Sequence, residues 1–219
     1  MEDKLLRRKK LQNTDLYCIS AEEYSKGRSN IEVVKELLDV GIKIIQYREK
    51  DKKMLDKYKE CEEIRRLTKE YDADFIINDD VALAMIVGSD GVHIGQDDLP
   101  IEKVRQLVGE EMFIGLSTHS KDQAIAALMR GADYIGVGPI FRTFTKKDVC
   151  EPVGLSYLEY VVNNINIPFV AIGGIKEHNI CEVSKCGAKC IALVTEIVGS
   201  DNITQKVMDI RKIINSYKI

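Results

Sequence analysis

Short apolar segments alternate with amphipathic charged segments eight times along this chain of 219 residues, which limits the fold more than any other feature. The apolar segments are rich in Ile and Val without interruption, as is typical of parallel strands buried on both faces. We expect strands at Leu16–Ser20, Ile42–Tyr47, Asp74–Asn78, Gly91–Gly95, Met112–Ser117, Asp133–Gly138, Pro168–Ile172 and Lys189–Val194. We expect helices at Asn30–Val40, Lys52–Glu70, Val81–Val87, Ile101–Val108, Lys121–Arg130, Leu155–Asn163, Glu177–Lys185 and Ile203–Ser216.

Eight strands, each followed by a helix, predict an α/β protein with a single (β/α)8 TIM barrel. A doubly wound open sheet is the alternative, but no GxGxxG turn follows the first strand. A glycine that ends a helix and leads into a strand recurs before strands two, four, six and eight, at Gly41, Gly88, Gly131 and Gly187. No linker rich in Pro, Gly or Ser interrupts the pattern. Residues 1–219 are therefore expected to form one domain, with residues 1–13 as an N-terminal arm or helix.

The charge balance and the N-terminus exclude several classes of protein. The net charge is only −3, so we expect no nucleic-acid partner and no binding to an anionic membrane surface. The longest apolar run, residues 81–87, is far shorter than the roughly 20 residues of a membrane-spanning helix. The N-terminal sequence MEDKLLRRKK lacks the apolar core of a secretory signal.

Six cysteines are scattered along the chain without a CxxC pair. This usage is typical of reduced structural thiols, and we therefore expect a cytoplasmic protein. Cys181, Cys186 and Cys190 form the only cluster, so a metal or redox site there is the alternative.

Polar residues follow the strands at the end where a β/α barrel carries its active site. The strand ends carry QYREK (46–50), NDD (78–80), GQDD (95–98), STH (117–119), GPIFRTFTKKD (138–148), GG (173–174) and VT (194–195). A charged loop by itself is usually only solvated, but the ends of parallel barrel strands meet at one rim. We therefore predict the active site at this rim.

The rim residues carry charges that suit a diphosphate and a metal ion. Arg48, Lys50 and Lys146 provide cations for phosphate oxygens, Arg as a planar fork and Lys as a point charge. Asp79 and Asp98 follow neighbouring strands, and we expect no base near them. One or two carboxylates, completed by substrate phosphate and water, are the usual environment of Mg²⁺. The pattern predicts a diphosphate held together with Mg²⁺.

A second phosphate site is predicted after strands seven and eight, at Gly174 and Thr195. Many β/α barrels bind phosphate there on free backbone N–H groups. Two anion sites across one barrel mouth imply two phosphorylated substrates, or one substrate phosphorylated at both ends. Because side chains alternate along a strand, a Thr195 that faces the mouth would turn Glu196 outward, towards the helices or solvent.

Six motifs, in order, resemble the thiamine-phosphate synthase family from Leu16 to about Asn202. They are QYREK (46–50), INDD (77–80), GVHIGQDD (91–98), GLSTH (115–119), GADYIGVGPIF with TFTKKD (131–148) and AIGGI (171–175). The resemblance implies that hydroxymethylpyrimidine diphosphate is joined to thiazole phosphate with Mg²⁺ as cofactor and release of pyrophosphate. It also implies a dissociative substitution, which needs no general base.

The resemblance implies a role for each rim residue. Asp79 and Asp98 would hold the metal. The pyrimidine diphosphate would be held by Gln46, Arg48, Lys50, Asn78, Ser117 and Lys146, and the thiazole phosphate by Thr143, Thr145, Gly174, Val194 and Thr195. Within these sets we expect catalytic roles for Arg48, Lys50, Ser117 and Lys146, and we add the loop neighbours Tyr47, Glu49 and Phe144 as substrate-binding residues. The chain departs from the family pattern at Thr195-Glu196, where Ser-Ala is common.

Two other functions are compatible with the same barrel. A thiazole tautomerase-like relative would use His119 for acid–base catalysis but would not need the carboxylates or the QYREK and TFTKK motifs. A regulator that only binds thiamine phosphates would need no turnover. His93 and His178 are expected to be structural, while the role of His119 stays open. The sequence also leaves open whether the chain forms a homo-oligomer.

Overall fold

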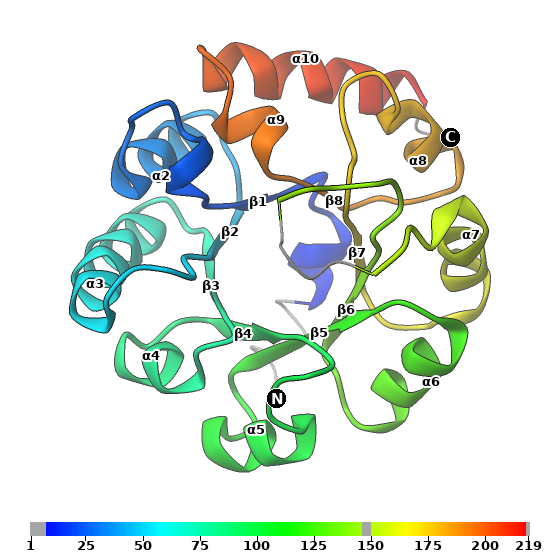
Figure 1. Ribbon diagram of the computed structural model, residues 1–219, viewed down its shortest axis with the longest axis horizontal. Coiled ribbons are helices and arrows are strands. Elements are labelled where there is room, and N and C mark those ends of the chain that lie inside the picture. The colour runs from blue at the N-terminus through cyan, green and yellow to red at the C-terminus, as the bar shows by residue number, and fades with distance from the viewer. Residues whose placement is uncertain (1–7, 146–149, 218–219) are drawn as a thin grey trace.

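A closed barrel of eight parallel strands is surrounded by helices in the computed structural model, which describes residues 8–145 and 150–217 (Figure 1). The strands are β1 (Leu16–Ile19), β2 (Ile44–Tyr47), β3 (Asp74–Asn78), β4 (Gly91–Ile94), β5 (Phe113–Thr118), β6 (Tyr134–Val137), β7 (Phe169–Ala171) and β8 (Ile191–Leu193). Each strand pairs with the next along the chain, and β8 closes the barrel by pairing with β1. The predicted (β/α)8 barrel is confirmed, because an open sheet would leave β1 and β8 apart.

Helices follow the strands as predicted. They are α2 (Asn30–Asp39), α3 (Met54–Glu70), α4 (Val81–Ile86), α5 (Ile101–Val108), α6 (Lys121–Met129), α7 (Gly154–Asn164), α8 (Ile180–Lys185) and α10 (Ile203–Ser216). Helix α8 begins three residues later than predicted, because the Asn179 side chain accepts from the Lys176 N–H at 2.7 Å and holds a turn there. Two short helical segments were not predicted: η1 (Glu22–Tyr24) and α9 (Thr195–Val198).

Two apolar cores stabilise the barrel. The larger core lies between the strands and the surrounding helices, and it takes outward-facing residues such as Leu16 and Ile45. The smaller core fills the barrel itself with the alternate residues, among them Tyr17, Ile44 and Tyr134. Because both faces of each strand are buried, the strands are continuously apolar rather than alternating.

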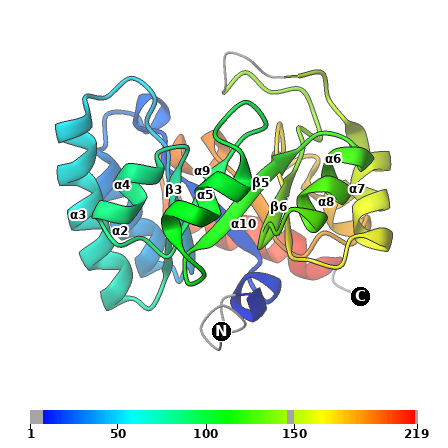
Figure 2. The ribbon, with the colours of Figure 1, turned by 90° about the horizontal axis from the view of Figure 1, so that it is seen from below.

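The N-terminal segment closes the lower end of the barrel (Figure 2). Residues 8–12 are helical, and Leu11 is buried in the interior core. Arg8 donates to the buried Asp133 at 3.1 Å, and Lys10 donates to Asp74 at 3.3 Å. Of the predicted arm or helix, the structure shows the helix over these residues.

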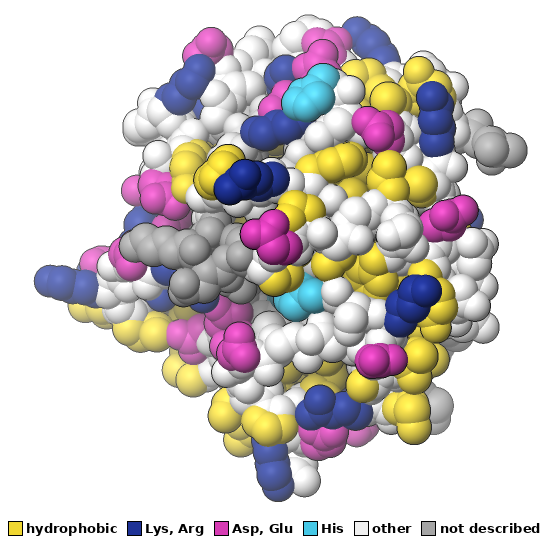
Figure 3. Space-filling model, turned by 45° about the vertical axis from the view of Figure 1, so that its right-hand side comes forward, with side chains coloured by type: hydrophobic (Ala, Val, Ile, Leu, Met, Phe, Trp, Pro, Cys, Tyr) yellow, Lys and Arg dark blue, Asp and Glu magenta, His cyan; other side chains and the backbone are white. Residues whose placement is uncertain are grey.

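The protein surface carries charges of both signs, which bears on the partners expected from the sequence. On the face drawn in Figure 3, basic and acidic side chains are interspersed rather than gathered by sign. In the described part of the chain, no helix combines the length and the apolar character needed to cross a membrane.

Candidate active site

The barrel mouth at the C-terminal ends of the strands brings the predicted site residues together. Figure 2 shows the loop between β6 and α7 at this end, opposite the N-terminal helix. All eight strands are parallel, so residues far apart in the sequence end at the same rim. The rim therefore has the location that active sites occupy in this fold.

Asp79 lies in a strained turn directly after β3. Its φ of 61° is in the left-handed region, which Asp adopts more readily than most residues. The Asp79 N–H donates to the carbonyl of His93 at 2.8 Å, which fixes the turn to β4. Lys50 Nζ donates to Asp79 Oδ2 at 2.6 Å. The prediction that no base lies near the two aspartates is therefore wrong, since the loop after β2 carries Lys50 across to β3.

Asp98 completes a carboxylate pair with Asp79. The two carboxyl groups hydrogen-bond each other, and Asp98 Oδ2 also accepts from the Gly95 N–H at 2.6 Å. Partial burial and then the charge of Asp79 raise the pKa of Asp98. Burial opposes ionisation of Asp79, but the hydrogen bond and charge of Lys50 outweigh it and lower the pKa of Asp79. Two carboxylates this close favour a proton or a cation between them.

This pair would supply only some of the ligands of a magnesium ion. Among residues 8–145 and 150–217, no group of three or more His, Cys, Asp or Glu side chains could hold a metal ion. Asp79 and Asp98 would supply two oxygen ligands, and the remaining ligands would have to come from substrate phosphate and water. That arrangement is the common one for Mg²⁺.

Gln46 and Ser117 lie on inward-facing positions of β2 and β5. Gln46 is 3% exposed, and its Nε2 donates to Tyr17 Oη at 2.8 Å. Ser117 Oγ lies 2.9 Å from Nε2 of His93. His93, which we predicted to be structural, thus contacts a predicted substrate-binding residue. Asn78 is half-buried at the end of β3.

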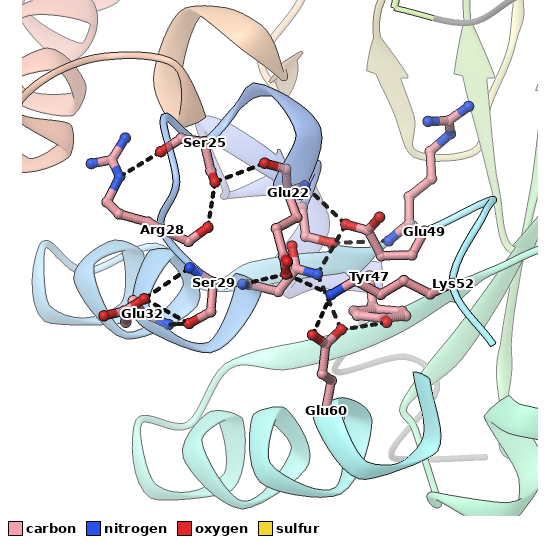
Figure 4. Close-up of polar contacts among 12 residues, drawn as sticks. Glu22, Ser25, Arg28, Ser29, Glu32, Tyr47, Glu49, Lys52 and Glu60 are labelled. Carbon is pink, nitrogen blue, oxygen red and sulfur yellow. Dashed lines mark hydrogen bonds and ion pairs between the residues drawn. The ribbon is translucent and has the colours of Figure 1, made fainter. Parts of the chain in front are cut away.

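Tyr47 and Glu49 are turned away from the mouth into a polar network (Figure 4). Tyr47 Oη donates to Glu60 on α3 at 2.6 Å, and Lys52 bridges Glu60 and Glu22. Glu49 Oε1 accepts from the backbone N–H of Glu22 at 2.9 Å. Both side chains therefore hold the loop that carries Arg48 and Lys50, and we withdraw them from the substrate-binding set.

Gly174 lies tightly against the loop after β6. It has a φ of 64°, and a Cβ there would come within 2.4 Å of the Arg142 carbonyl oxygen. Only glycine permits this approach. Within the same loop, the hydroxyls of Thr143 and Thr145 lie 3.2 Å apart, whereas Phe144 is 79% exposed and stacks on Arg142.

The segment after β8 differs from the prediction. Val194 precedes a four-residue helix, α9, so the alternation of a strand does not apply to Thr195 and Glu196. Thr195 Oγ1 accepts from Lys176 Nζ at 2.7 Å, and Glu196 pairs with Lys176 at 3.2 Å. Glu196 also lies 3.8 Å from Lys206 on α10, so its side chain faces the helix layer as expected. The cause is the start of helix α9 rather than the alternation of side chains along a strand. Lys176 was not among the candidate site residues predicted from the sequence. A cation two residues after Gly174, beside the predicted phosphate site, could have indicated it.

The remaining predicted residues have the following locations. Arg48 is half-buried, and its backbone N–H donates to Ser20 Oγ at 3.0 Å. His119 Nδ1 hydrogen-bonds the carbonyl of Gly138 at 2.5 Å. His178 is exposed in the turn before α8, rather than on the helix as predicted. Lys146 lies outside the described residues.

A closed β/α barrel with cations and paired carboxylates on one rim defines a class: TIM-barrel enzymes that act on phosphorylated small molecules. Comparisons then identify the family. A sequence model described as thiamine monophosphate synthase (TMP-TENI) matches residues 16–197. The chain belongs to this family.

Proteins of known name are similar to this chain over nearly its whole length. Thiamine-phosphate synthase of Pelotomaculum thermopropionicum is 64% identical over 205 residues, covering 94% of each chain. Thiamine-phosphate synthase of Lawsonia intracellularis is 58% identical over 202 residues, covering 92% of this chain and 93% of the relative. The solved structure of thiamine phosphate pyrophosphorylase from Pyrococcus furiosus has a TM-score of 0.86 at 35% identity, covering 94% of this chain and 98% of its own.

Proposed function

We propose that the chain joins hydroxymethylpyrimidine diphosphate to thiazole phosphate, releasing pyrophosphate and forming thiamine phosphate, with Mg²⁺ and in the cytoplasm. Family membership over residues 16–197 supports the reaction. The observation that carries the assignment of the site is the contact of Lys50 with Asp79 beside Asp98 at the barrel mouth. A cation beside a carboxylate pair suits a diphosphate that is bound together with Mg²⁺.

The proposed roles follow the two sides of the mouth. Arg48, Lys50 and Lys146 neutralise the diphosphate as it leaves, and Asp79 and Asp98 hold the metal. A bound Mg²⁺ supplies further positive charge to the leaving pyrophosphate. Gln46, Asn78 and Ser117 hold the pyrimidine half, whereas Gly174, Val194, Thr195 and the two threonines of the β6–α7 loop hold the thiazole phosphate. In this proposal, the two sets of residues together bring the thiazole nitrogen to the pyrimidine methylene carbon.

The proposed mechanism needs no general base. The bond between the methylene carbon and the diphosphate oxygen breaks first, and the thiazole nitrogen then captures the pyrimidine methylene cation with its lone pair. Charge stabilisation of the leaving group and positioning of the nucleophile carry such a reaction. Nδ1 of His119 hydrogen-bonds the carbonyl oxygen of Gly138, which supports a structural role for this ring.

A single-turnover assay with both substrates tests the proposed function. We expect pyrophosphate and thiamine phosphate to form together in equal amounts. A thiazole tautomerase would instead isomerise a thiazole carboxylate phosphate without releasing pyrophosphate. A regulator would bind thiamine phosphate without turnover of either substrate. Either of these results would overturn the proposal.

Arg48→Lys should lower kcat/KM for the pyrimidine substrate about 5- to 150-fold, which corresponds to roughly 1–3 kcal/mol. Lysine keeps the charge but loses the planar fork that binds two phosphate oxygens. Steady-state kinetics at saturating thiazole phosphate measures the effect. Arg66→Lys, on the exposed face of α3, is the matched control and should be neutral. Unchanged kinetics for Arg48→Lys would show that no bidentate contact exists.

Thr195→Val should raise KM for thiazole phosphate about 5- to 30-fold, since one hydrogen bond to a charged acceptor is worth about 1–2 kcal/mol. KM for the pyrimidine diphosphate should not change. Glu196→Gln should alter neither KM, because Lys176 and Lys206 already compensate the charge of Glu196. A lower thiazole-phosphate KM for Glu196→Gln would mean that the carboxylate faces and repels the phosphate.

A further inference from the structure

A continuous chain of side-chain hydrogen bonds crosses the barrel beneath the mouth. Gln46 Nε2 donates to Tyr17 Oη at 2.8 Å, and Tyr17 Oη lies 2.9 Å from Tyr134 Oη. Tyr134 Oη lies 3.1 Å from Nδ1 of His93, whose Nε2 lies 2.9 Å from Ser117 Oγ. The five residues come from β2, β1, β6, β4 and β5, so the chain links both sides of the proposed pyrimidine site.

The middle of this chain is fully enclosed. Tyr17 is 2% exposed and Tyr134 is 1% exposed, and burial raises the pKa of both phenols, so both keep their hydrogens. Polar groups in such an interior are costly unless they are paired, and here each hydroxyl has partners on two sides. Burying these polar groups costs free energy, and the network ends on the two side chains proposed to bind the pyrimidine. We therefore look for a role of the network beyond packing.

Two strand glycines make room for the chain. A Cβ at Gly115 would lie 2.2 Å from Cζ of Tyr134 and 2.5 Å from Nδ1 of His93. A Cβ at Gly136 would lie 3.3 Å from Cε1 of His93. Glycine inside a strand weakens it and often marks a close approach of other atoms. The glycines of GLSTH and GADYIGVG are therefore explained by the space that the two rings need.

One arrangement of hydrogens pairs every donor along the chain with an acceptor. Because Gln46 donates to Tyr17 Oη, each phenol hydrogen finds an acceptor when Tyr17 donates to Tyr134 and Tyr134 donates to Nδ1 of His93. In this arrangement the hydrogen on Nε2 of His93 is directed at Ser117 Oγ. The hydroxyl hydrogen of Ser117 can then donate to a ligand in the barrel mouth. The Gln46 side chain uses an N–H for Tyr17, so its amide oxygen can accept a hydrogen bond from the ligand.

We propose that Tyr17, Tyr134 and His93 are positioning residues that hold Gln46 as a hydrogen-bond acceptor and Ser117 as a donor towards the pyrimidine substrate. This inference rests on the proposed function, in which these two side chains bind that substrate. A heteroaromatic ring with an amino group and a ring nitrogen matches one acceptor and one donor. Rings lacking the amino group leave the Gln46 oxygen unpaired and are rejected.

Tyr134→Phe tests the proposal, because it removes the central hydroxyl and keeps the ring. We expect the Kd for hydroxymethylpyrimidine diphosphate, measured by calorimetry, to rise about tenfold. KM for thiazole phosphate should not change. The preference of the wild type for this substrate over an analogue without the ring amino group should shrink by a similar factor.

The matched control is Tyr157→Phe. Tyr157 is also a buried tyrosine, and its hydroxyl donates to Thr118 Oγ1 at 2.7 Å, one residue from Ser117 but outside the chain. It should lose some stability and leave Kd and substrate preference unchanged. His93→Gln, which keeps one donor and one acceptor, should retain more affinity than His93→Leu.

A double-mutant cycle separates positioning from a general loss of structure. Ser117→Ala should cost less affinity in the Tyr134→Phe background than in the wild type, because the chain is already broken. Additive effects, or equal effects of Tyr134→Phe and Tyr157→Phe, would overturn the inference. Failure of the wild type to form thiamine phosphate would instead overturn the proposed function, and the calorimetric Kd values would still decide the role of the chain.

Discussion

Replacing Asp98 by Asn is expected to lower kcat/KM on the order of 100- to 1000-fold and to raise the Mg²⁺ concentration needed for half-maximal activity. Metal charge stabilisation of a leaving group is worth several kcal/mol, and each factor of ten in rate corresponds to about 1.4 kcal/mol. Asn keeps an oxygen that can accept from the Gly95 N–H, so the loop after β4 should retain its shape. A titration of activity against Mg²⁺ at fixed substrate concentrations measures both effects.

Asp97→Asn is the control for this prediction. Asp97 is the exposed neighbour of Asp98 in the same loop, and its replacement changes the net charge by the same amount. We expect activity and Mg²⁺ dependence near those of the wild type. If Asp98→Asn behaves like Asp97→Asn, the metal site has been placed on the wrong carboxylate. Chelation with EDTA should abolish the wild-type activity, and added Mg²⁺ should restore it.

Asp133→Ala should lower the free energy of unfolding by about 3–5 kcal/mol, the usual cost of removing one partner of a buried ion pair. Asp133 is 0% exposed and accepts from Arg105 at 2.5 Å, from Arg8 at 3.1 Å and from the Ile114 N–H at 2.9 Å. Its loss leaves all three donors without this acceptor. For a chain of this length the midpoint of thermal unfolding should fall by roughly 6–20 °C.

Asp201→Ala provides the comparison for an exposed carboxylate. The Asp201 side chain is 91% exposed and pairs with Lys26 at 2.6 Å, so its removal should change stability by less than about 1 kcal/mol. Calorimetric or circular-dichroism melts of both variants measure the difference. Similar melts for the two variants would show that the Asp133 cluster contributes no more than a surface ion pair.

The order and type of the main elements could be read from the chain because each depends on a local pattern. Continuous apolar segments predicted strands buried on both faces, and glycines such as Gly41 and Gly187 marked helix ends, where the structure has φ of 80° and 96°. Short segments such as α9 and η1 could not be predicted in this way. They have too few residues for a hydrophobic period, and contacts with distant residues decide their conformation.

The candidate site was predicted at the right rim, but not in its contacts. Strand ends and charge indicated where Asp79, Asp98 and Lys50 lie, because all parallel strands end on one side. That Lys50 pairs with Asp79 depends on how the loop after β2 crosses to β3. Tyr47 and Glu49 belong to the QYREK motif, which predicts ligand binding. Only their contacts with α3 and η1 show that these two side chains support the loop instead.

The sequence by itself determined the closed (β/α)8 architecture and the end of the barrel at which the candidate active-site residues lie. These properties follow from hydrophobic burial and chain direction, which act along short stretches of sequence. The tertiary structure alone decided which of those polar groups meet. The chain from Gln46 through Tyr17 and Tyr134 to His93 joins residues up to 117 positions apart, and its hydrogen bonds exist only once the closed barrel sets their side chains within 3.1 Å of one another.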